Sequence, residues 1–277
     1  MSESKESKKE SNKEPVFVVG FPKSGNTWLA RLLAEVTDSN IAVNNPLDGV
    51  NMADNSSERK GQFIIHKEHV VNNIEQAMQS KVVYIVRDVR DVLVSGFYHC
   101  NRWCNDDLIN RNIFLKWYFY HEVKKLNKKW QGNVWAEFKY SARCFIKSLI
   151  RYKYEKVRVG NWSDHVSFWS KSPNVIVVRY EDLLRGTEAE MKKILLAFKL
   201  DVSDEVLLKA ISNQSFKKKK SDFLKSGDPL NAKFLRRGKE GGWKELLPTT
   251  LVREIEQRHA VVMNTYGYKL EYYEGEK

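Results

Sequence analysis

Residues 16–33 read VFVVGFPKSGNTWLARLL: a run of β-branched and apolar residues, a turn bounded by two glycines and the start of a helical pattern. Gly20 and Gly25 have the spacing of the nucleotide-binding P-loop, G-x-x-x-x-G-K-[ST]. The second glycine is followed by asparagine and threonine, however, and the lysine lies inside the loop as Lys23. The stretch predicts a strand, a phosphate-binding loop and a helix, and it leaves open which phosphate-bearing ligand requires a lysine at that position.

Other runs in the chain resemble the first strand, PVFVVG (15–20). KVVYIVR (81–87) and NVIVVRY (174–180) are strongly β-branched, and QFIIHK (62–67) is weaker. Continuous apolar runs suit strands that are buried on both faces, as in a parallel sheet covered by helices. Helical periodicity appears at 26–36, 70–79, 91–99, 187–200 and 204–212. This alternation predicts an α/β fold, a three-layer sandwich around a central parallel sheet.

The remaining segments differ in composition. Residues 1–14 hold four lysines and four glutamates and are predicted to be a disordered tail, because they cannot bury enough apolar surface to offset the entropy of ordering. Residues 101–170 are rich in Trp, Tyr, Phe and Lys and are predicted to form a helical lobe beside the sheet. We expect residues 15–277 to form a single domain, which is long enough to bury a substantial core.

Composition also restricts the compartment and the partners. The three cysteines, Cys100, Cys104 and Cys144, are an odd number in 277 residues and indicate reduced thiols in a cytoplasm rather than disulfides. No stretch has the apolar core of a secretory signal or the ~20 apolar residues of a membrane span, so we expect a soluble protein. The formal net charge of +12 favours an anionic partner, which from charge alone is nucleic acid, an anionic membrane or a polyanionic small ligand.

Polar side chains follow each predicted strand at its carboxyl end, where open α/β sheets bind ligands. Lys23 follows the first strand, and HKEH (66–69) ends the second. Arg87 ends the third, with Ser95 two helical turns further on, and RYEDL (179–183) follows the last. Each has a simple structural explanation when it is taken alone. Together they bring a phosphate loop, a candidate base, and the cation Arg87 with the hydroxyl of Ser95 to the carboxyl ends of the strands.

These segments resemble the cytosolic and bacterial sulfotransferases, which use 3'-phosphoadenosine 5'-phosphosulfate (PAPS) as sulfuryl donor and release 3'-phosphoadenosine 5'-phosphate (PAP). PKSGNTWL (22–29) is similar to the family's 5'-phosphosulfate loop. VRDVRDVLVSGFYH (86–99) is similar to its 3'-phosphate element, and FLRRGKEGGWK (234–244) is similar to its third signature. The motifs stand in the family's order between residues 16 and 244. The resemblance implies a PAPS-dependent sulfotransferase with a P-loop-like phosphosulfate-binding loop.

The resemblance also implies a donor site assembled from these motifs. Lys23 would contact the bridging oxygen and the 5'-phosphate, and the residues after it would supply backbone and hydroxyl donors. Arg87 and Ser95 would hold the 3'-phosphate. The complete implied set is Lys23, Ser24, Gly25, Asn26 and Thr27 at the 5'-phosphate, Trp28, Tyr180, Ser215 and Phe216 near the adenine, and Arg87, Ser95 and the segment Phe234, Leu235, Arg236, Arg237 and Gly238 at the 3'-phosphate.

His69 is the general base that the resemblance implies, because K-x-H at 67–69 is similar to the family's K-T-H. An imidazole with a reference pKa of about 6.5 can accept the proton of an attacking hydroxyl near neutrality. Lys23 and Lys67 would offset the charge that accumulates on the leaving phosphate as the sulfuryl group moves in line. Glu68 and His66 remain alternative bases, since some glycan sulfotransferases use a glutamate. No metal is required.

Several positions depart from the family pattern. Residues 87–91 read R-D-V-R-D where R-N-P-K-D is usual, and Gly242 stands where aspartate is common. KELLPTTLVRE (244–254) does not meet the family's dimer signature, which leaves the oligomeric state open. The acceptor is open as well: an alcohol, phenol, alkaloid, steroid or sugar, sulfated at oxygen or nitrogen. We expect residues 101–170 and 37–61 to form its pocket.

Two other functions compete with sulfuryl transfer. A P-loop kinase or NTPase needs Lys and Ser/Thr after the second glycine and an acidic strand end for magnesium, whereas this chain has Asn26 and Arg87 at those places. A nucleic-acid or polyanion-binding protein would use basic runs such as Lys217–Lys220, and its affinity would fall with salt. That function does not explain why glycine, hydroxyl and lysine recur at strand ends. We therefore expect a small-molecule acceptor rather than a nucleic-acid or membrane partner.

Overall fold

The computed structural model describes most of the chain outside its amino terminus and a long central segment. The described residues are 13–42, 59–69, 71, 73–102, 161–227, 232, 235, 238–247 and 249–273. They fall into two compact units. The first contains the described residues up to Arg87 and those from Asp164 to Lys239, and the second contains those from Asp88 to Ser163 and from Glu240 onward. Residues 103–160 of the predicted helical lobe and residues 1–12 of the tail predicted at 1–14 lie outside the described residues. The predicted end of the tail was wrong by one residue, because Glu14 pairs with β3 and begins the first strand.

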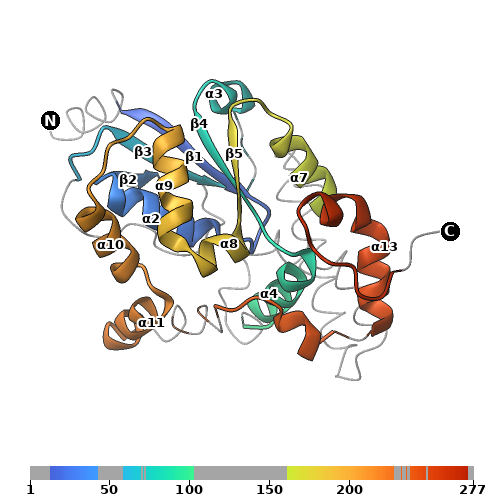
Figure 1. Cartoon of the computed structure of the whole chain (residues 1–277). Helices are drawn as coiled ribbons and strands as arrows, with labels where there is room; N and C mark the ends of the chain where they lie inside the picture. The colour runs from blue at the N-terminus through green and yellow to red at the C-terminus, as the bar shows by residue number, and fades with distance from the viewer. Residues whose placement is uncertain are drawn as a thin grey trace, which may run out of the picture. The chain divides into compact units, whose positions relative to one another are not determined.

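The first unit is built on a five-stranded parallel sheet in the order β2-β3-β1-β4-β5 (Figure 1). Its strands are β1 (Glu14–Gly20), β2 (Asn40–Ala42), β3 (Phe63–Glu68), β4 (Lys81–Val86) and β5 (Val175–Arg179). The predicted parallel α/β fold is therefore confirmed. The three-residue strand β2 was not predicted, because so short a segment carries no periodicity.

The register of the sheet places the carboxyl ends of its central strands next to one another. Val19 of β1 pairs with Glu68 of β3, and Gly20 pairs with Ile85 of β4. In the sheet, β2 and β3 lie toward one edge from β1, and β4 and β5 lie toward the other edge. The chain therefore reverses its direction across the sheet at β1, which marks a topological switch point. Ligands of open α/β sheets bind in the crevice at such a point.

Four helices cover one face of this sheet (Figure 1): α2 (Asn26–Val36), α8 (Tyr180–Arg185), α9 (Thr187–Ala197) and α10 (Asp204–Asn213). In α2 the buried residues Leu29, Leu32, Leu33 and Val36 recur at helical spacing and pack on the apolar side chains of β1 and β3. Ser203 caps α10 by accepting a hydrogen bond from the Val206 amide. The predicted helices at 26–36, 187–200 and 204–212 correspond to α2, α9 and α10.

The opposite face of the sheet carries α3 (Ile74–Met78) and the part of α7 (Trp162–Ser170) that begins at Asp164. Tyr84 of β4 points to this face, since its neighbours in the strand belong to the core on the other side. Helix α3 is shorter than the predicted 70–79, because the side chain of Asn73 accepts from the Gln76 amide and caps the helix there. Helix α11 (Phe216–Lys225) contains the lysine run and has no buried residues.

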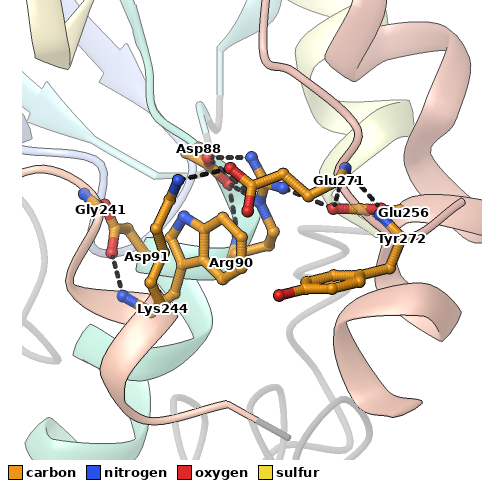
Figure 2. Close-up of polar contacts among 9 residues, drawn as sticks. Asp88, Arg90, Asp91, Gly241, Lys244, Glu256, Glu271 and Tyr272 are labelled. Carbon is orange, nitrogen blue, oxygen red and sulfur yellow. Dashed lines mark hydrogen bonds and ion pairs between the residues drawn. The ribbon is translucent and has the colours of Figure 1, made fainter. Parts of the chain in front are cut away.

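The second unit consists of α4 (Val89–Arg102), the short 3-10 helix η3 (Gly242–Glu245) and α13 (Thr249–Thr265). Its small core joins Val94, Trp243 and Val252. Figure 2 shows that a buried polar cluster ties these elements together around Arg90, whose guanidinium lies 2.7 Å from Asp88 and 2.6 Å from Glu256.

Asp91 connects the first turn of α4 to η3. Its carboxylate accepts hydrogen bonds from the amides of Gly241 (2.7 Å) and Trp243 (3.0 Å). The Arg90 guanidinium stacks on the Trp243 ring at 3.9 Å. Two of the sequence motifs singled out above, VRDVRDVLVS and GGWK, are thus bonded to each other in this unit. Within the described ranges, no helix combines the length and the apolar composition needed to cross a membrane.

Candidate functional site

The loop between β1 and α2 is shaped by two residues in the left-handed region of backbone conformation. Lys23 has φ 73° and Gly25 has φ 110°. Gly25 is the N-cap of α2, and its carbonyl oxygen accepts from the amides of Trp28 (2.9 Å) and Leu29 (3.2 Å). The amides that precede Trp28 at a helix start have no acceptor one turn back in the helix. Such a turn at a helix start presents N–H groups and the positive end of the helix dipole to an anion.

Glycine is required at position 25 for a steric reason as well. A Cβ placed there would lie 2.7 Å from the Cδ2 atom of Tyr180. Gly25→Ala should therefore lower the free energy of unfolding by about 3 kcal/mol, because it combines left-handed strain with a clash against a buried ring. Urea unfolding measures the loss. Gly227→Ala is the matched control: Gly227 has φ 71° but nothing within 4 Å of the added carbon, so its loss should be about 1 kcal/mol. Equal losses in the two variants would contradict the clash.

Ser24 lies between the two left-handed residues of this loop and is 0% exposed. Its hydroxyl finds no hydrogen-bond partner among the described residues. A buried polar group without a partner costs about 1–3 kcal/mol. An anionic ligand in the loop would accept this hydrogen bond, so the loop fits a phosphate group.

Asn26 uses its side chain to tie the loop to the sheet rather than to face a ligand. Its Nδ2 donates to the carbonyl oxygens of Gly20 (3.0 Å) and Glu68 (3.2 Å), at the ends of β1 and β3. Any contact of Asn26 with a phosphate would therefore use its backbone amide. Gly20 is confined as well, since a Cβ there would lie 2.7 Å from Ile85 and 2.9 Å from Asn26.

Arg87 joins three of the predicted site segments. Its guanidinium donates to the carbonyl oxygens of Lys23 (3.2 Å) and Lys239 (3.3 Å) and stacks on the Tyr180 ring at 4.2 Å. Its Nε is buried and has no hydrogen-bond partner among the described residues. The arginine thus lies between the loop after β1 and the segment that follows Gly238.

Aromatic side chains flank this arginine and the loop. Trp28 of α2 packs edge-on against Tyr180, with ring centroids 5.9 Å apart. Tyr180 begins α8 rather than ending β5, as the predicted strand 174–180 would have it. A Cβ at Gly238 would lie 2.5 Å from the ring of Phe216, so these two predicted residues are in contact. Ser215 uses its hydroxyl to cap α11, where it accepts from the Lys218 amide.

The candidate base His69 follows β3 directly. Its Nδ1 lies 2.9 Å from the carbonyl oxygen of Gly20. A carbonyl oxygen only accepts, so Nδ1 carries the proton and Nε2 of the neutral ring carries the basic lone pair. The same carbonyl receives the hydrogen bond of Asn26, which couples the phosphate loop to the base.

The other members of the HKEH segment are placed differently. His66 stacks on the ring of Phe17 at 4.8 Å, and burial lowers its pKa. Lys67 and Glu68 are buried residues of β3 at 7% and 6% exposure. By strand alternation, Lys67 shares the face of Ile65, which belongs to the core under α2, and its neighbours share the other face.

Some predicted residues lie outside this arrangement. Phe234, Arg236 and Arg237 are not among the described residues. Ser95 is half-buried on α4 and belongs to the second unit, whereas the half-buried Leu235 belongs to the first. Over the described part of the chain, no group of three or more His, Cys, Asp or Glu side chains could hold a metal ion.

The sequence did not single out His165, which contacts the candidate base, or Tyr84, which contacts His165. His165 of α7 approaches the backbone oxygen of His69 through its Nε2, at 2.9 Å, and the hydroxyl of Tyr84 through its Nδ1, at 2.8 Å. A lone histidine in a helix with several aromatic neighbours cannot be told from a core residue by its pattern. Only the folded arrangement identifies this one.

Comparison with protein families and curated proteins gives a consistent result. The model of the family described as "Sulfotransferase domain" matches residues 13–267. The chain is 22% identical over 268 residues to sulfotransferase 1 family member D1 of Rattus norvegicus, covering 92% of this chain and 85% of that protein. It is 23% identical over 259 residues to sulfotransferase 2A1 of Homo sapiens, covering 83% of this chain and 78% of that protein.

Solved structures with the same fold include two proteins that bind PAP. Mouse sulfotransferase SULT7A1 complexed with PAP matches with a TM-score of 0.58 at 22% identity, covering 92% of this chain and 87% of that chain. Retinol dehydratase in complex with androsterone and the inactive cofactor PAP matches with a TM-score of 0.55 at 17% identity, covering 93% of this chain and 82% of that chain.

Proposed function

The chain belongs to the sulfotransferase domain family, and we propose that it transfers a sulfuryl group from PAPS to a hydroxyl or amine of a small-molecule acceptor, releasing PAP. The observation that carries this proposal is the loop after β1. The Ser24 hydroxyl, which is buried and has no hydrogen-bond partner within the described ranges, lies beside the left-handed Lys23, and Arg87 donates to the Lys23 carbonyl. This arrangement supplies hydrogen-bond donors and positive charge for a phosphate-bearing ligand.

The described residues divide into those that would hold each part of PAPS. Lys23, Ser24 and the amides at the start of α2 would bind the 5'-phosphosulfate. Arg87 would bind the 3'-phosphate. Trp28, Tyr180 and Phe216 would flank the adenine, since aromatic faces stack on bases. Ser95, Arg236 and Arg237 complete the proposed set from other parts of the chain.

His69 would act as the general base. When bound, PAPS supplies an electrophilic sulfur: the acceptor oxygen or nitrogen forms a bond to it as the bond between sulfur and the bridging phosphate oxygen breaks. Nε2 of His69 would take the acceptor's proton, because Nδ1 already donates to Gly20. Lys23 and Lys67 would stabilise the negative charge that develops on the leaving phosphate.

The test combines turnover with binding. The full chain is incubated with PAPS and a panel of alcohols, phenols, alkaloids, steroids, amines and sugars, and PAP release is measured. Androsterone and retinol belong in the panel, because they are bound in retinol dehydratase structures. PAP affinity is measured by calorimetry. Release of PAP that depends on one acceptor class supports the proposal, whereas magnesium-dependent ATP hydrolysis without PAP binding would overturn it.

Arg87→Ala should weaken PAP binding by about 30-fold, because charge-assisted hydrogen bonds contribute about 1.5–3 kcal/mol. The sharper measurement compares PAP with adenosine 5'-phosphate, which lacks the 3'-phosphate. Wild-type protein should prefer PAP, and the variant should lose most of that preference. Arg185→Ala, at an exposed arginine of α8, is the matched control and should leave both affinities unchanged. An undiminished preference in Arg87→Ala would contradict a 3'-phosphate contact.

A further inference from the structure

His165 connects the buried face of the sheet to the backbone of the proposed base. Its Nε2 lies 2.9 Å from the carbonyl oxygen of His69, and its Nδ1 lies 2.8 Å from the hydroxyl oxygen of Tyr84. Tyr84 is 0% exposed and His165 is 7% exposed, so both hydrogen bonds are shielded from water. Hydrogen bonds in such surroundings hold groups in place more firmly than they do at the surface.

The chemistry of these groups determines the direction of both hydrogen bonds. The carbonyl oxygen of His69 only accepts, so His165 Nε2 donates to it. A neutral imidazole then has its lone pair on Nδ1, which accepts from the Tyr84 hydroxyl. Burial lowers the pKa of His165 to about 4, with the hydrogen bond to His69 acting in the opposite direction, so the ring is neutral at pH 7. The Tyr84 hydroxyl thus donates to the His165 imidazole, which in turn donates to the His69 carbonyl.

We infer that His165, oriented by Tyr84, is a positioning residue that holds the base His69 for proton transfer. The inference rests on the proposed function, in which Nε2 of His69 takes the acceptor's proton. Other hydrogen bonds also hold this part of the chain, among them His69 Nδ1 to the Gly20 carbonyl and Asn26 Nδ2 to the carbonyl of Glu68, which precedes His69. The hydrogen bond from His165 holds the carbonyl of His69 itself, so the peptide groups before and after the His69 Cα are both fixed. A displacement of about 1 Å at a reacting group can lower the rate by about 100-fold.

Replacing His165 with glutamine or with asparagine distinguishes a positioning role from a role in core packing alone. Glutamine places its amide nitrogen near the position of Nε2, so His165→Gln can still donate to His69. Asparagine places its terminal atoms near Nδ1, so His165→Asn can still accept from Tyr84 but does not reach His69. Both variants lose the edge-on contact of the imidazole with Phe21, whose ring centroid is 5.6 Å away. A residue that only fills the core would therefore give similar losses in both.

We expect the two variants to differ in kcat. His165→Asn should lower kcat about tenfold, which corresponds to the loss of one buried hydrogen bond at the base. His165→Gln should stay within about threefold of wild type, as should the acceptor KM and the PAP dissociation constant of both variants. Steady-state kinetics at saturating PAPS and calorimetry with PAP measure these quantities. Equal losses of kcat in the two variants, or a loss confined to KM, would overturn the inference.

A second measurement does not depend on turnover. Nitrogen-15 NMR of the full chain with labelled histidine reports the tautomer of His69, which should be Nδ1–H in wild type and in His165→Gln and a mixture in His165→Asn. If these spectra are found but no acceptor is sulfated, the proposed function fails and the positioning of His69 stands. An unchanged His69 spectrum in His165→Asn overturns the inference even where sulfuryl transfer is found.

A third variant covers the case in which His165→Asn does not fold. Tyr84→Phe removes only the hydroxyl that orients His165, and it keeps the ring that packs in the core. It should lower kcat by about threefold and introduce a second His69 tautomer, because His165 is then free to turn about its side-chain torsions. Wild-type values of both kcat and the tautomer in this variant would overturn the inference.

Discussion

Replacing His69 with alanine should lower kcat by about 1000-fold while PAP affinity stays within about twofold of wild type. The rate loss follows from the contribution of a positioned general base, which is about 100- to 10,000-fold. PAP affinity should be retained because the imidazole donates to the Gly20 carbonyl and is assigned no contact with the nucleotide. Asn26 keeps its own bond to that carbonyl, so the phosphate loop should keep its shape. Turnover with PAPS and calorimetry with PAP measure the two effects.

Neighbouring residues in the same segment provide the controls. His66→Ala removes a histidine three residues away that stacks on Phe17, so it should cost stability but change kcat by less than about threefold. Glu68→Gln tests the alternative base and should likewise retain most turnover. Substantial activity in His69→Ala, together with its loss in Glu68→Gln, would transfer the role of base to the carboxylate.

The closeness of several candidate donor-site residues was predictable because a parallel sheet brings separate strand ends together. Lys23, Arg87 and Tyr180 lie in motifs far apart in the sequence, yet Arg87 donates to the Lys23 carbonyl and stacks on the Tyr180 ring. Alternating strands and helices were enough to predict the sheet, and the carboxyl ends of its strands are where such folds bind ligands. The roles of these residues stay predictions until binding is measured.

The hydrogen bonds around the candidate base His69 could not be predicted from local sequence patterns. Tyr84 looks like one more large residue in a buried strand, and His165 like a core histidine, because a pattern does not show which side chains meet across the sheet. Asn26 was predicted to bind phosphate through the loop backbone, which stays a prediction, but the bonds of its side chain to Gly20 and Glu68 were not predicted. Only the packing of α7 on β4 and of the loop on β3 places these polar groups against one another.

A second large effect is expected in the second unit, at Glu256 of α13. Its carboxylate is 0% exposed and accepts from Arg90 (2.6 Å) and from the backbone amides of Glu271 (3.0 Å) and Tyr272 (2.8 Å) (Figure 2). It also accepts from the amide of Tyr273 (2.9 Å). Burial acts to lower the pKa of Arg90, but the hydrogen bonds and charges of Asp88 and Glu256 outweigh it and raise that pKa. The guanidinium therefore stays charged and requires its partners.

Glu256→Ala should lower the free energy of unfolding by about 4 kcal/mol, because it leaves a buried cation with half of its partners and several backbone amides without an acceptor. Arg90 retains Asp88, which limits the loss. Glu256→Gln keeps an acceptor oxygen without the charge and should lose about half as much. The control is Glu254→Ala at an exposed position of the same helix, which should change stability by less than about 0.5 kcal/mol. Urea unfolding measures all three, and limited proteolysis should cut the last described residues, 271–273, faster only in the Glu256 variants. Equal stability of Glu256→Ala and Glu254→Ala would show that this carboxylate does not hold the second unit together.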